Sequence, residues 1–265
     1  MLSPRLGVSQ YTVLTSTIPR GLDMLAQTGI PGLEIFMEGP DWWDPGVLHR
    51  IAQARGMFSG SLSVHPPAWD INIASYTKPV REMSIEVYRR SIEWTKHLGG
   101  TYVVLHVGWR GTPELPRREC LVRAEQAIGA LAPRACQAGV TLAVENVGWF
   151  GQEICDQTEF TELIWRLPEG VGALLDVGHA LLAGWDIPAA VRALAPRIVA
   201  VHLHDNDGRS DQHLPIGRGR IDWEGLLPLI PEMPEGCHFI LEYAPGTPLE
   251  SVVQGGAQVD RFLNG

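Results

Sequence analysis

Short runs of apolar and β-branched residues recur along the chain, and longer stretches with helical periodicity separate them. Runs such as "GLEIFM" and "TYVVLHVG" are candidates for strands. Within 80–99, residues such as Met83 and Val87 recur at helical spacing, which predicts an amphipathic helix. The predicted strands cover residues 6–13, 32–37, 58–65, 101–108, 140–147, 171–179, 198–205 and 237–244. This alternation predicts a closed (β/α)8 barrel of the TIM-barrel class, formed by residues 1–265 as a single domain.

Glycine follows several of the helical stretches directly before the next strand, as in "LAQTGIPG", "KHLGGTY" and "CQAGVT". Glycine is a common stop signal after a helix, so these positions support the alternation. The alternative fold is an open, doubly wound sheet, in which a G-x-G-x-x-G loop is expected after the first strand. The first strand instead continues as "GVSQYTVLTST", and no segment reads as a P-loop, so the barrel is favoured.

Ionisable side chains close six consecutive predicted strands, and in a barrel such strand ends meet at one face. Any one of them could be a hydrogen-bonded structural residue. Gathered together, however, like charges are costly unless a cation neutralises them, so the pattern predicts a divalent-metal site. Mixed imidazole and carboxylate donors without nearby cysteine favour Zn, Mn, Fe or Co over a calcium cage. The residues concerned are His65, His106, Glu145, Asp176, His179, His202, His204, Asp205 and Glu242.

The composition limits the classes of molecule that we expect the protein to bind. A formal net charge of −9 argues against a nucleic-acid surface, which needs clustered Lys and Arg. The four cysteines lie far apart without a C-x-x-C pair, which fits a reduced, cytoplasmic protein, and no apolar run is long enough to cross a bilayer. We therefore expect a protein that acts on a small molecule away from membranes, as a monomer or a homodimer.

As a set, the motifs around the strand ends resemble those of the xylose isomerase-like barrel superfamily over nearly the whole chain. They are "HPPAWDINIAS", "VVLHVG", "LAVENVG", "LLDVGHALLAG", "VHLHDN", "DQHLPIGRGRIDW" and "ILEYA", in this order. The superfamily contains sugar and sugar-phosphate isomerases and epimerases, and also endonuclease IV. The resemblance implies an enzyme with one to three divalent ions, which could be Zn, Mn, Co, Fe or Mg.

Similarity to the isomerases and epimerases implies one ion and a carbohydrate substrate. The ligands would be Glu145, Asp176, His202 and Glu242. Glu145 and Glu242 would also be the catalytic acid/base pair that moves a proton next to a metal-bound carbonyl. His179 would bind a substrate oxygen, and His213 stands where ketohexose 3-epimerases carry a substrate-binding Arg.

Similarity to endonuclease IV implies three ions and a phosphate-ester hydrolase as the alternative function. The extended set of ligands adds His65, His106, His179, Asp211 and His213 to the four above. Two features depart from that enzyme: the first strand lacks the His of a G-x-H-x-S pattern, and the loop "MEGPDWWDPG" carries Glu38, Asp41 and Asp44. Acidic groups repel phosphates, so this loop argues against DNA.

Several further residues have both a functional and a structural interpretation. Arg218 could bind a substrate phosphate or carboxylate, or lie exposed in its loop. Asn146 could orient Glu145 or bind a substrate hydroxyl, and Trp109 could wall the pocket or pack in the core. Trp42 and Trp43 could likewise stack on a sugar or pack beneath a helix. His204 is expected on the opposite face of its strand from His202, in a structural or supporting role.

Overall fold

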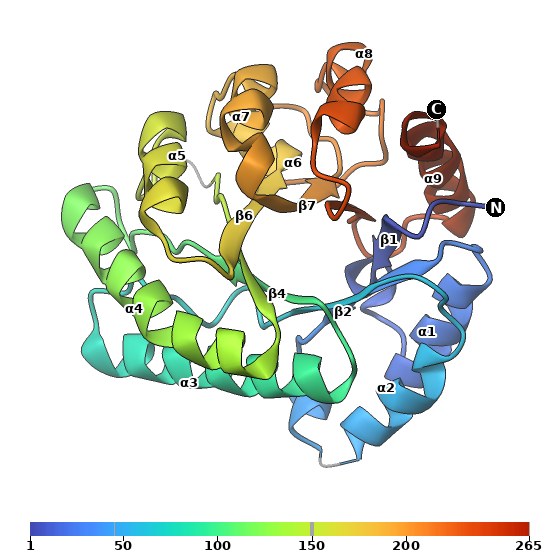
Figure 1. Cartoon of the computed structure of the whole chain (residues 1–265), viewed down its shortest axis with the longest axis horizontal. Coiled ribbons are helices and arrows are strands. Elements are labelled where there is room, and N and C mark those ends of the chain that lie inside the picture. The colour runs from blue at the N-terminus through green and yellow to red at the C-terminus, as the bar shows by residue number, and fades with distance from the viewer. Residues whose placement is uncertain (45, 149–150, 265) are drawn as a thin grey trace.

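The strands close into one barrel in sequence order, and every neighbouring pair is parallel (Figure 1). The computed structural model describes residues 1–44, 46–148 and 151–264. Within these ranges each of the predicted strands is confirmed, although most are shorter than the apolar runs that predicted them. They are β1 (Leu6–Ser9), β2 (Gly32–Phe36), β3 (Leu62–His65), β4 (Tyr102–His106), β5 (Thr141–Glu145), β6 (Val171–Asp176), β7 (Ile198–Leu203) and β8 (His238–Leu241).

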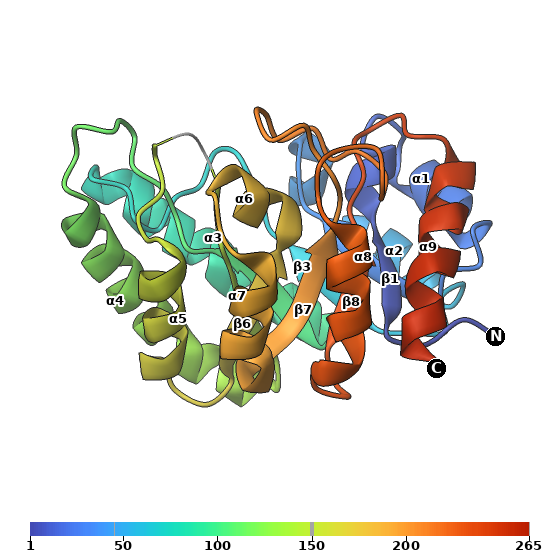
Figure 2. The same ribbon diagram turned by 90° about the horizontal axis from the view of Figure 1, so that it is seen from above.

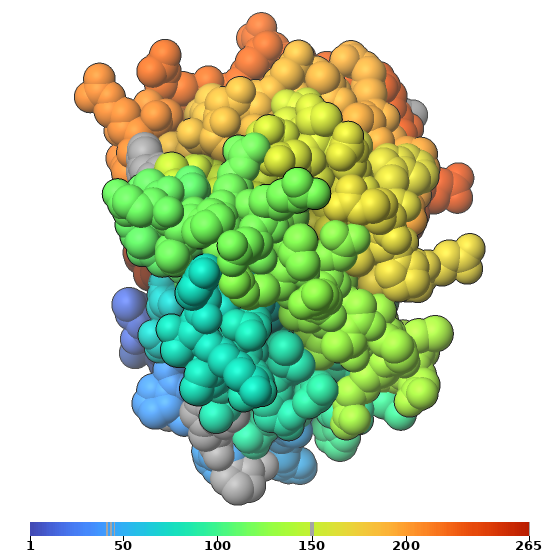
Figure 3. All heavy atoms as spheres, turned by 90° about the vertical axis from the view of Figure 1, so that its left-hand side faces the viewer, coloured from blue at the N-terminus to red at the C-terminus, as the bar shows by residue number. Residues whose placement is uncertain are grey.

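Helices connect the strands and form a ring outside the barrel (Figures 1 and 2). They are α1 (Ile18–Ala26), α2 (Val47–Arg55), α3 (Lys78–His97), α4 (Arg117–Ala138), α5 (Gln157–Arg166), α6 (Val177–Leu182), α7 (Ile187–Leu194), α8 (Trp223–Leu226) and α9 (Leu249–Leu263). Short 3-10 helices add η1 (Gln10–Val13), η2 (Pro40–Trp43), η3 (Ala195–Arg197) and η4 (Leu227–Glu232). Figure 3 shows α3, α4 and α5 packed side by side as a continuous outer wall. None of the described helices is both long enough and apolar enough to span a bilayer.

Two differences from the predicted strands arise where a side chain caps the following helix. The apolar run 171–179 is divided at Asp176, whose Oδ1 accepts a hydrogen bond of 2.7 Å from the backbone N–H of His179 and starts α6. After β1, the Ser9 hydroxyl accepts from the Tyr11 N–H and starts η1. A capped N-terminus satisfies an otherwise unpaired backbone donor, which ends the strand earlier than hydrophobicity alone suggests.

The barrel interior is filled by side chains, as expected for a barrel of this size. Tyr102, Val104, Ala143, Leu174 and Ala200 form a separate buried cluster inside the strands. The small side chains at 143 and 200 leave space for the Tyr102 ring, which is buried. This packed layer supports the residues above it at the carboxyl ends of the strands.

Strand register decides which of these end residues become neighbours. His106 of β4 lies beside Glu145 of β5, and Asp176 of β6 lies beside His202 of β7. At the other side of the barrel, the carboxyl end of β2 is paired with His65 of β3. Parallel registry therefore brings imidazoles and carboxylates from distant parts of the sequence to one rim.

Candidate active site and metal centre

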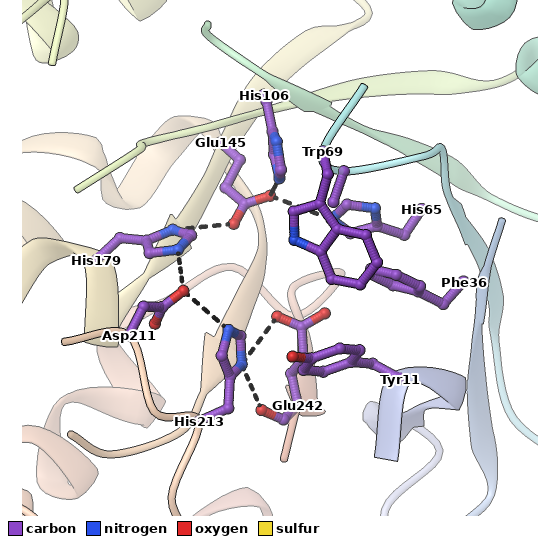
Figure 4. A pocket seen from close by; sticks show the side chains of 11 residues that line it. Tyr11, Phe36, His65, Trp69, His106, Glu145, His179, Asp211, His213 and Glu242 are labelled. Atoms are coloured by element: carbon purple, nitrogen blue, oxygen red, sulfur yellow. Dashed lines mark hydrogen bonds and ion pairs between the residues drawn. The ribbon is translucent and has the colours of Figure 1, made fainter. Parts of the chain in front are cut away.

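A cavity of about 270 Å³ opens at the carboxyl ends of the strands (Figure 4). Ligand pockets typically range from about 300 to 1,000 Å³, so this cavity suits a small molecule. It is lined by Tyr11, Phe36, His65, Ala68, Trp69, His106, Glu145, His179, Asp211, His213 and Glu242. Most of the nine predicted ligands therefore face one space, while Asp176 and His202 lie beside it and are fully buried.

The first cluster of possible ligands joins β3, β4 and β5. The Nε2 atoms of His65 and His106 lie 3.7 and 3.1 Å from Oε2 of Glu145. Nδ1 of His65 lies 2.7 Å from the Pro66 carbonyl, which can only accept, so this nitrogen carries the proton. The Nε2 lone pair of His65 is therefore turned toward Glu145, as a metal ligand requires.

A second cluster joins α6 to the loop that follows β7. Oδ2 of Asp211 lies 3.1 Å from Nε2 of His179 and 3.0 Å from Nε2 of His213. The Nδ1 atoms of the two imidazoles face the backbone carbonyls of Asn146 and Glu242, at 3.0 and 2.9 Å. Both rings are thus oriented by backbone carbonyls so that Nε2 points toward the Asp211 carboxylate.

The third cluster surrounds Nδ1 of His202 and contains the four ligands of the predicted single-ion site. Oε2 of Glu242 is 3.2 Å from this nitrogen, and one carboxylate oxygen each of Glu145 and Asp176 is 3.6 Å away. On the other side of the ring, Nε2 of His202 lies 3.0 Å from Oε1 of Glu34. The imidazole is completely buried.

The described residues fit divalent ions on two independent grounds. Sets of three residues within these clusters place their possible ligand atoms within 4.8 Å of one another: His65, His106 and Glu145; His179, Asp211 and His213; and Glu145, Asp176 and His202. Glu242 belongs to two further such sets, one with Glu34 and His202 and one with His204 and His213. Buried atoms such as Oε2 of Glu145, Nδ1 of His202 and Oδ1 of Asp211 have no hydrogen-bond partner among the residues that the structure describes. Because buried polar atoms are almost always satisfied, unpaired donors and acceptors that converge in this way suit a bound cation.

The predicted orientation of His204 is wrong. Side chains two residues apart on a strand point to the same face, so His204 follows His202 toward the site. Its Nε2 lies 3.0 and 2.9 Å from the two carboxylate oxygens of Asp176, and its ring stacks on that of His213 with centroids 3.9 Å apart. The predicted supporting role fits this geometry, because a second imidazole orients the Asp176 carboxylate.

Charges within the site shift its pKa values strongly. Burial alone would lower the pKa of His213, but the Asp211 carboxylate raises it to about 9. Burial would raise the pKa of Glu242, but the neighbouring His202 and His213 lower it to about 2. In the metal-free protein the imidazole of His213 is therefore protonated and the carboxyl of Glu242 is ionised at neutral pH.

The loop between β7 and α8 is held in place by Asp205, which is fully buried. Its carboxylate accepts hydrogen bonds from four backbone N–H groups and from the Trp223 indole; the donors are Asn206, Gly217, Gly219, Ile221 and Trp223, at 2.8 to 3.1 Å. Backbone hydrogen bonds of 2.7 and 2.8 Å also pair Asp205 with Leu214. These contacts close the loop and bring Asp211 and His213 over the cavity.

His213 has a left-handed backbone, with φ of 46°, and no other non-glycine residue in the described ranges has a positive φ. This conformation is uncommon for a residue other than glycine, although His adopts it more often than most, and it persists where the surroundings impose it. Here the His213 carbonyl accepts from the Ala244 N–H at 2.9 Å, while its ring contacts Asp211 and Glu242. The strain is concentrated at a predicted ligand, as is common at functional sites.

Three residues that the sequence suggested as substrate contacts do not line the cavity. The Asn146 amide is used by the β6 backbone, because it accepts from the Asp176 N–H at 2.9 Å and donates to the Asp176 carbonyl at 3.0 Å. Arg218 is exposed in its loop and does not line the cavity. Trp109 is half-buried behind His106, with ring centroids 6.4 Å apart, and is not part of the lining. The structure thus gives these residues no direct contact with the space that a substrate would occupy.

Sequence reasoning did not identify the aromatic side of the cavity. Tyr11, Phe36 and Trp69 lie across from His179 and Asp211 (Figure 4), with ring centroids 5.0 to 6.4 Å apart. Each follows or ends one of the first three strands, which is the signal that could have revealed them. Of the two tryptophans that the sequence suggested for this role, Trp42 is buried against Trp94, whereas the Trp43 side chain lies outside the described residues, as does that of Asp41.

Glu34 was also missed, although it interrupts the apolar run "GLEIFM". A carboxylate in the middle of a buried strand almost always has a partner. That isolated charge was the available signal, and the partner, His202, lies 168 residues further along the chain, as the two residue numbers show.

Metal binding should depend on pH because of the protonated imidazoles. A cation needs the free Nε2 lone pair of His213, so binding must displace a proton, and affinity should rise with pH until about pH 9. The stability of the metal-free protein depends on pH in the opposite direction. Because the folded state raises the pKa of His213, protonation of this imidazole stabilises the fold fully below pH ~6.5, and this stabilisation is lost as the pH rises through 9. Titration calorimetry in buffers of different ionisation enthalpy measures the number of protons released when the metal binds. A metal affinity that is constant between about pH 6.5 and 9 would contradict the prediction.

The loop anchor can be tested with Asp205→Asn. We expect the free energy of unfolding to fall by about 1–3 kcal/mol, because several buried N–H groups lose a charged acceptor. Urea denaturation of the metal-free protein measures this loss. Asp222→Asn is the matched control, since Asp222 caps α8 at the surface through the Gly225 N–H and Asn caps a helix equally well. Equal stabilities of the two variants would show that Asp205 does not hold the loop.

Several proteins of known sequence are similar to this chain over most of its length. An uncharacterized protein of Methanocaldococcus jannaschii is 27% identical over 240 residues, which cover 88% of this chain and 81% of the relative. A probable endonuclease 4 of Solibacter usitatus is 28% identical over 250 residues, covering 82% of each chain. The L-ribulose 3-epimerase of Mesorhizobium japonicum is 27% identical over 233 residues, covering 84% of this chain and 75% of the enzyme.

Among solved structures, a D-tagatose 3-epimerase-like protein superposes with a TM-score of 0.83 at 26% identity, covering 100% of this chain and 97% of the other. The sequence profile of the xylose isomerase-like TIM barrel matches residues 22–260. This match spans seven of the eight strands and all nine predicted ligand positions. The chain therefore belongs to the xylose isomerase-like TIM-barrel family.

Proposed function

We propose that this protein is a metal-dependent isomerase or epimerase that acts on a small sugar, sugar phosphate or related polyol. The observation that carries the proposal is the placement of two carboxylates. Glu145 and Glu242 both line the cavity, and each lies within 3.6 Å of Nδ1 of His202 from a different strand end. Two carboxylates on different sides of one small cavity can exchange a proton with both faces of a carbon atom.

The chain supplies the proton transfers. The ionised Glu242 can accept a proton from a carbon next to a carbonyl, and Glu145 can return one, or the reverse. A divalent ion held by Glu145, Asp176, His202 and Glu242 would polarise the carbonyl and its neighbouring hydroxyl. His179 and His213 line the same cavity and can bind substrate oxygens.

The cavity also defines the kind of substrate. Its aromatic side offers the rings of Tyr11, Phe36 and Trp69 to the apolar face of a sugar, while the opposite side is built from imidazoles and carboxylates. No Lys or Arg is found among the described residues of the lining, so a phosphate would have to be neutralised by bound metal. The similarity to L-ribulose 3-epimerase supports a small, polyhydroxylated substrate. Among the classes proposed, a neutral sugar or polyol fits these contacts best.

Isotope exchange tests the reaction. With the metal-replete protein and a panel of small ketoses and aldoses in deuterium oxide, we expect deuterium at a sugar carbon, detected by mass spectrometry. Glu145→Gln and Glu242→Gln should each lower the exchange rate by about 10²–10⁴-fold, since each removes a proton-transfer group. Glu125→Gln makes the same change on the exposed face of α4 and should have no effect. Absence of exchange across the panel would contradict the proposal.

A second candidate is phosphate-ester hydrolysis at a two- or three-metal centre. It is favoured by one observation: all nine positions of the extended set carry metal-ligating side chains, and each belongs to a set of three described residues that could hold an ion. Two ions about 3.5–4 Å apart can activate a water molecule and stabilise the leaving oxygen of an ester. The similarity to a probable endonuclease 4 supports this chemistry, whereas the acidic chain and the small cavity argue against a DNA duplex as substrate.

Metal counting and a cleavage assay separate the two candidates. For the proposed isomerase or epimerase, we expect no cleavage of a duplex with an abasic site by the metal-replete protein, even at low ionic strength, where phosphate contacts are strongest. Elemental analysis of the same sample gives the number of ions per chain. Three ions together with cleavage that a chelator abolishes would favour the hydrolase.

A further inference from the structure

Glu34 lies inside the barrel, beneath the metal centre, and is completely buried. It is not part of the cavity lining, so it has no contact with the space for a substrate. Oε2 accepts hydrogen bonds from the Ser63 hydroxyl at 2.9 Å and the Tyr102 hydroxyl at 3.3 Å. Oε1 faces Nε2 of His202 at 3.0 Å. One carboxylate therefore joins the packed interior of the barrel to a predicted metal ligand.

The contact with His202 decides which nitrogen of this ring is free. Oε1 of Glu34 is the carboxylate oxygen nearest to the ring, at 3.0 Å from Nε2 against 3.2 Å for the nearest one to Nδ1, although the two atoms do not meet the geometry of a hydrogen bond. It therefore favours the single proton of a neutral imidazole on Nε2. In a neutral imidazole the other nitrogen, Nδ1, then holds the lone pair. Nδ1 is the atom that faces Glu145, Asp176 and Glu242 at 3.2 to 3.6 Å. The position of Glu34 thus favours the tautomer in which Nδ1 of His202 can bind an ion together with these three carboxylates.

The acceptor also distinguishes His202 from the other imidazoles of the site. His65, His179 and His213 are each oriented through Nδ1 by a neutral backbone carbonyl. His202 instead faces a carboxylate, which attracts an N–H more strongly than a neutral carbonyl does. The opposite ring nitrogen thereby becomes a stronger lone-pair donor to a metal ion. A buried carboxylate is costly in a strand, so its presence here requires a compensating interaction.

We propose that Glu34 is a positioning residue that orients His202 and strengthens the central metal site relative to the two flanking clusters. Oε1 of Glu34 lies against Nε2 of His202, the Ser63 and Tyr102 hydroxyls donate hydrogen bonds to Oε2 of Glu34, and Nδ1 of His202 faces the position proposed for the ion. The ion at Glu145, Asp176, His202 and Glu242 is consequently the most tightly bound. The inference rests on the metal binding in the proposed function and is independent of the reaction that follows.

Metal affinity of the Glu34→Gln variant tests this role. The variant keeps the side-chain shape but removes the charged acceptor, and its amide can offer an N–H to Nε2, which favours the wrong tautomer. We expect the tightest Zn²⁺ affinity, measured by chelator competition, to fall by about 10–100-fold. The absorption spectrum of the Co²⁺ form should change as well, because the donor strength of His202 changes.

Ser63→Ala is the matched control, since it removes one hydroxyl from the same carboxylate and leaves the His202 contact in place. We expect its Zn²⁺ affinity to change by less than the affinity of Glu34→Gln. Thermal unfolding of the metal-free variants shows whether both are folded. Wild-type affinity and an unchanged Co²⁺ spectrum in folded Glu34→Gln would overturn the inference while leaving the proposed function intact. A wild-type protein that binds no metal would overturn both.

If Glu34→Gln does not fold, the wild-type protein still gives an answer. Histidine ¹⁵N shifts of the Zn²⁺ form, assigned with a His202→Asn variant, report which nitrogen of His202 carries the proton. A protonated Nε2 and a metal-bound Nδ1 support the role of Glu34. A protonated Nδ1 would overturn it.

Discussion

The carboxylate of Glu145 is the interaction on which the whole site depends. Oε2 faces the imidazoles of β3 and β4, and Oε1 lies 3.3 Å from Nδ1 of His179 and 3.6 Å from Nδ1 of His202. Burial disfavours its charge, but the surrounding imidazoles, His106 and His202 above all, hold its pKa well below the ordinary range. Because Glu145 belongs to two of the candidate clusters and contacts His179 of the third, a change in one cluster affects the other two.

The backbone orients this set of side chains. Carbonyl groups at the strand ends accept the Nδ1–H of three imidazoles, so the geometry of the barrel rim is transmitted directly to the ligand atoms. The loop after β7 adds Asp211 and His213, and Asp205 holds this loop closed from beneath. Strain at His213 is tolerated because contacts to the ring and the backbone both oppose relaxation. A rigid scaffold and a well-anchored loop therefore prepare the site before any ligand binds.

The same ligands are compatible with two reactions, and the remaining walls of the cavity favour one of them. An ion at the central cluster leaves Glu145 and Glu242 able to serve proton transfer, whereas ions in all three clusters would engage Glu145 twice. The aromatic side formed by Tyr11, Phe36 and Trp69 lines the cavity and offers apolar contact. An extended polyanion needs the opposite, an open and positively charged surface. Cavity shape and charge thus carry information about the substrate that the ligand set lacks.

The repeated strand and helix pattern was sufficient to predict the closed barrel, because periodicity and short connections are local properties of a sequence. The gathering of ionisable side chains at one rim was predictable for the same reason, because parallel strands in a barrel bring their carboxyl ends to one face. The inclusion of Asp211 and His213, which lie in a loop, rested instead on the resemblance to the superfamily. Side-chain partners were not predictable in this way. The orientation of His204, the use of the Asn146 amide by β6 and the contact between Glu34 and His202 depend on strand register and on packing across the barrel. These contacts join residues far apart in the chain, and only closure of the barrel brings them within hydrogen-bonding distance, which is why the tertiary structure alone decides them.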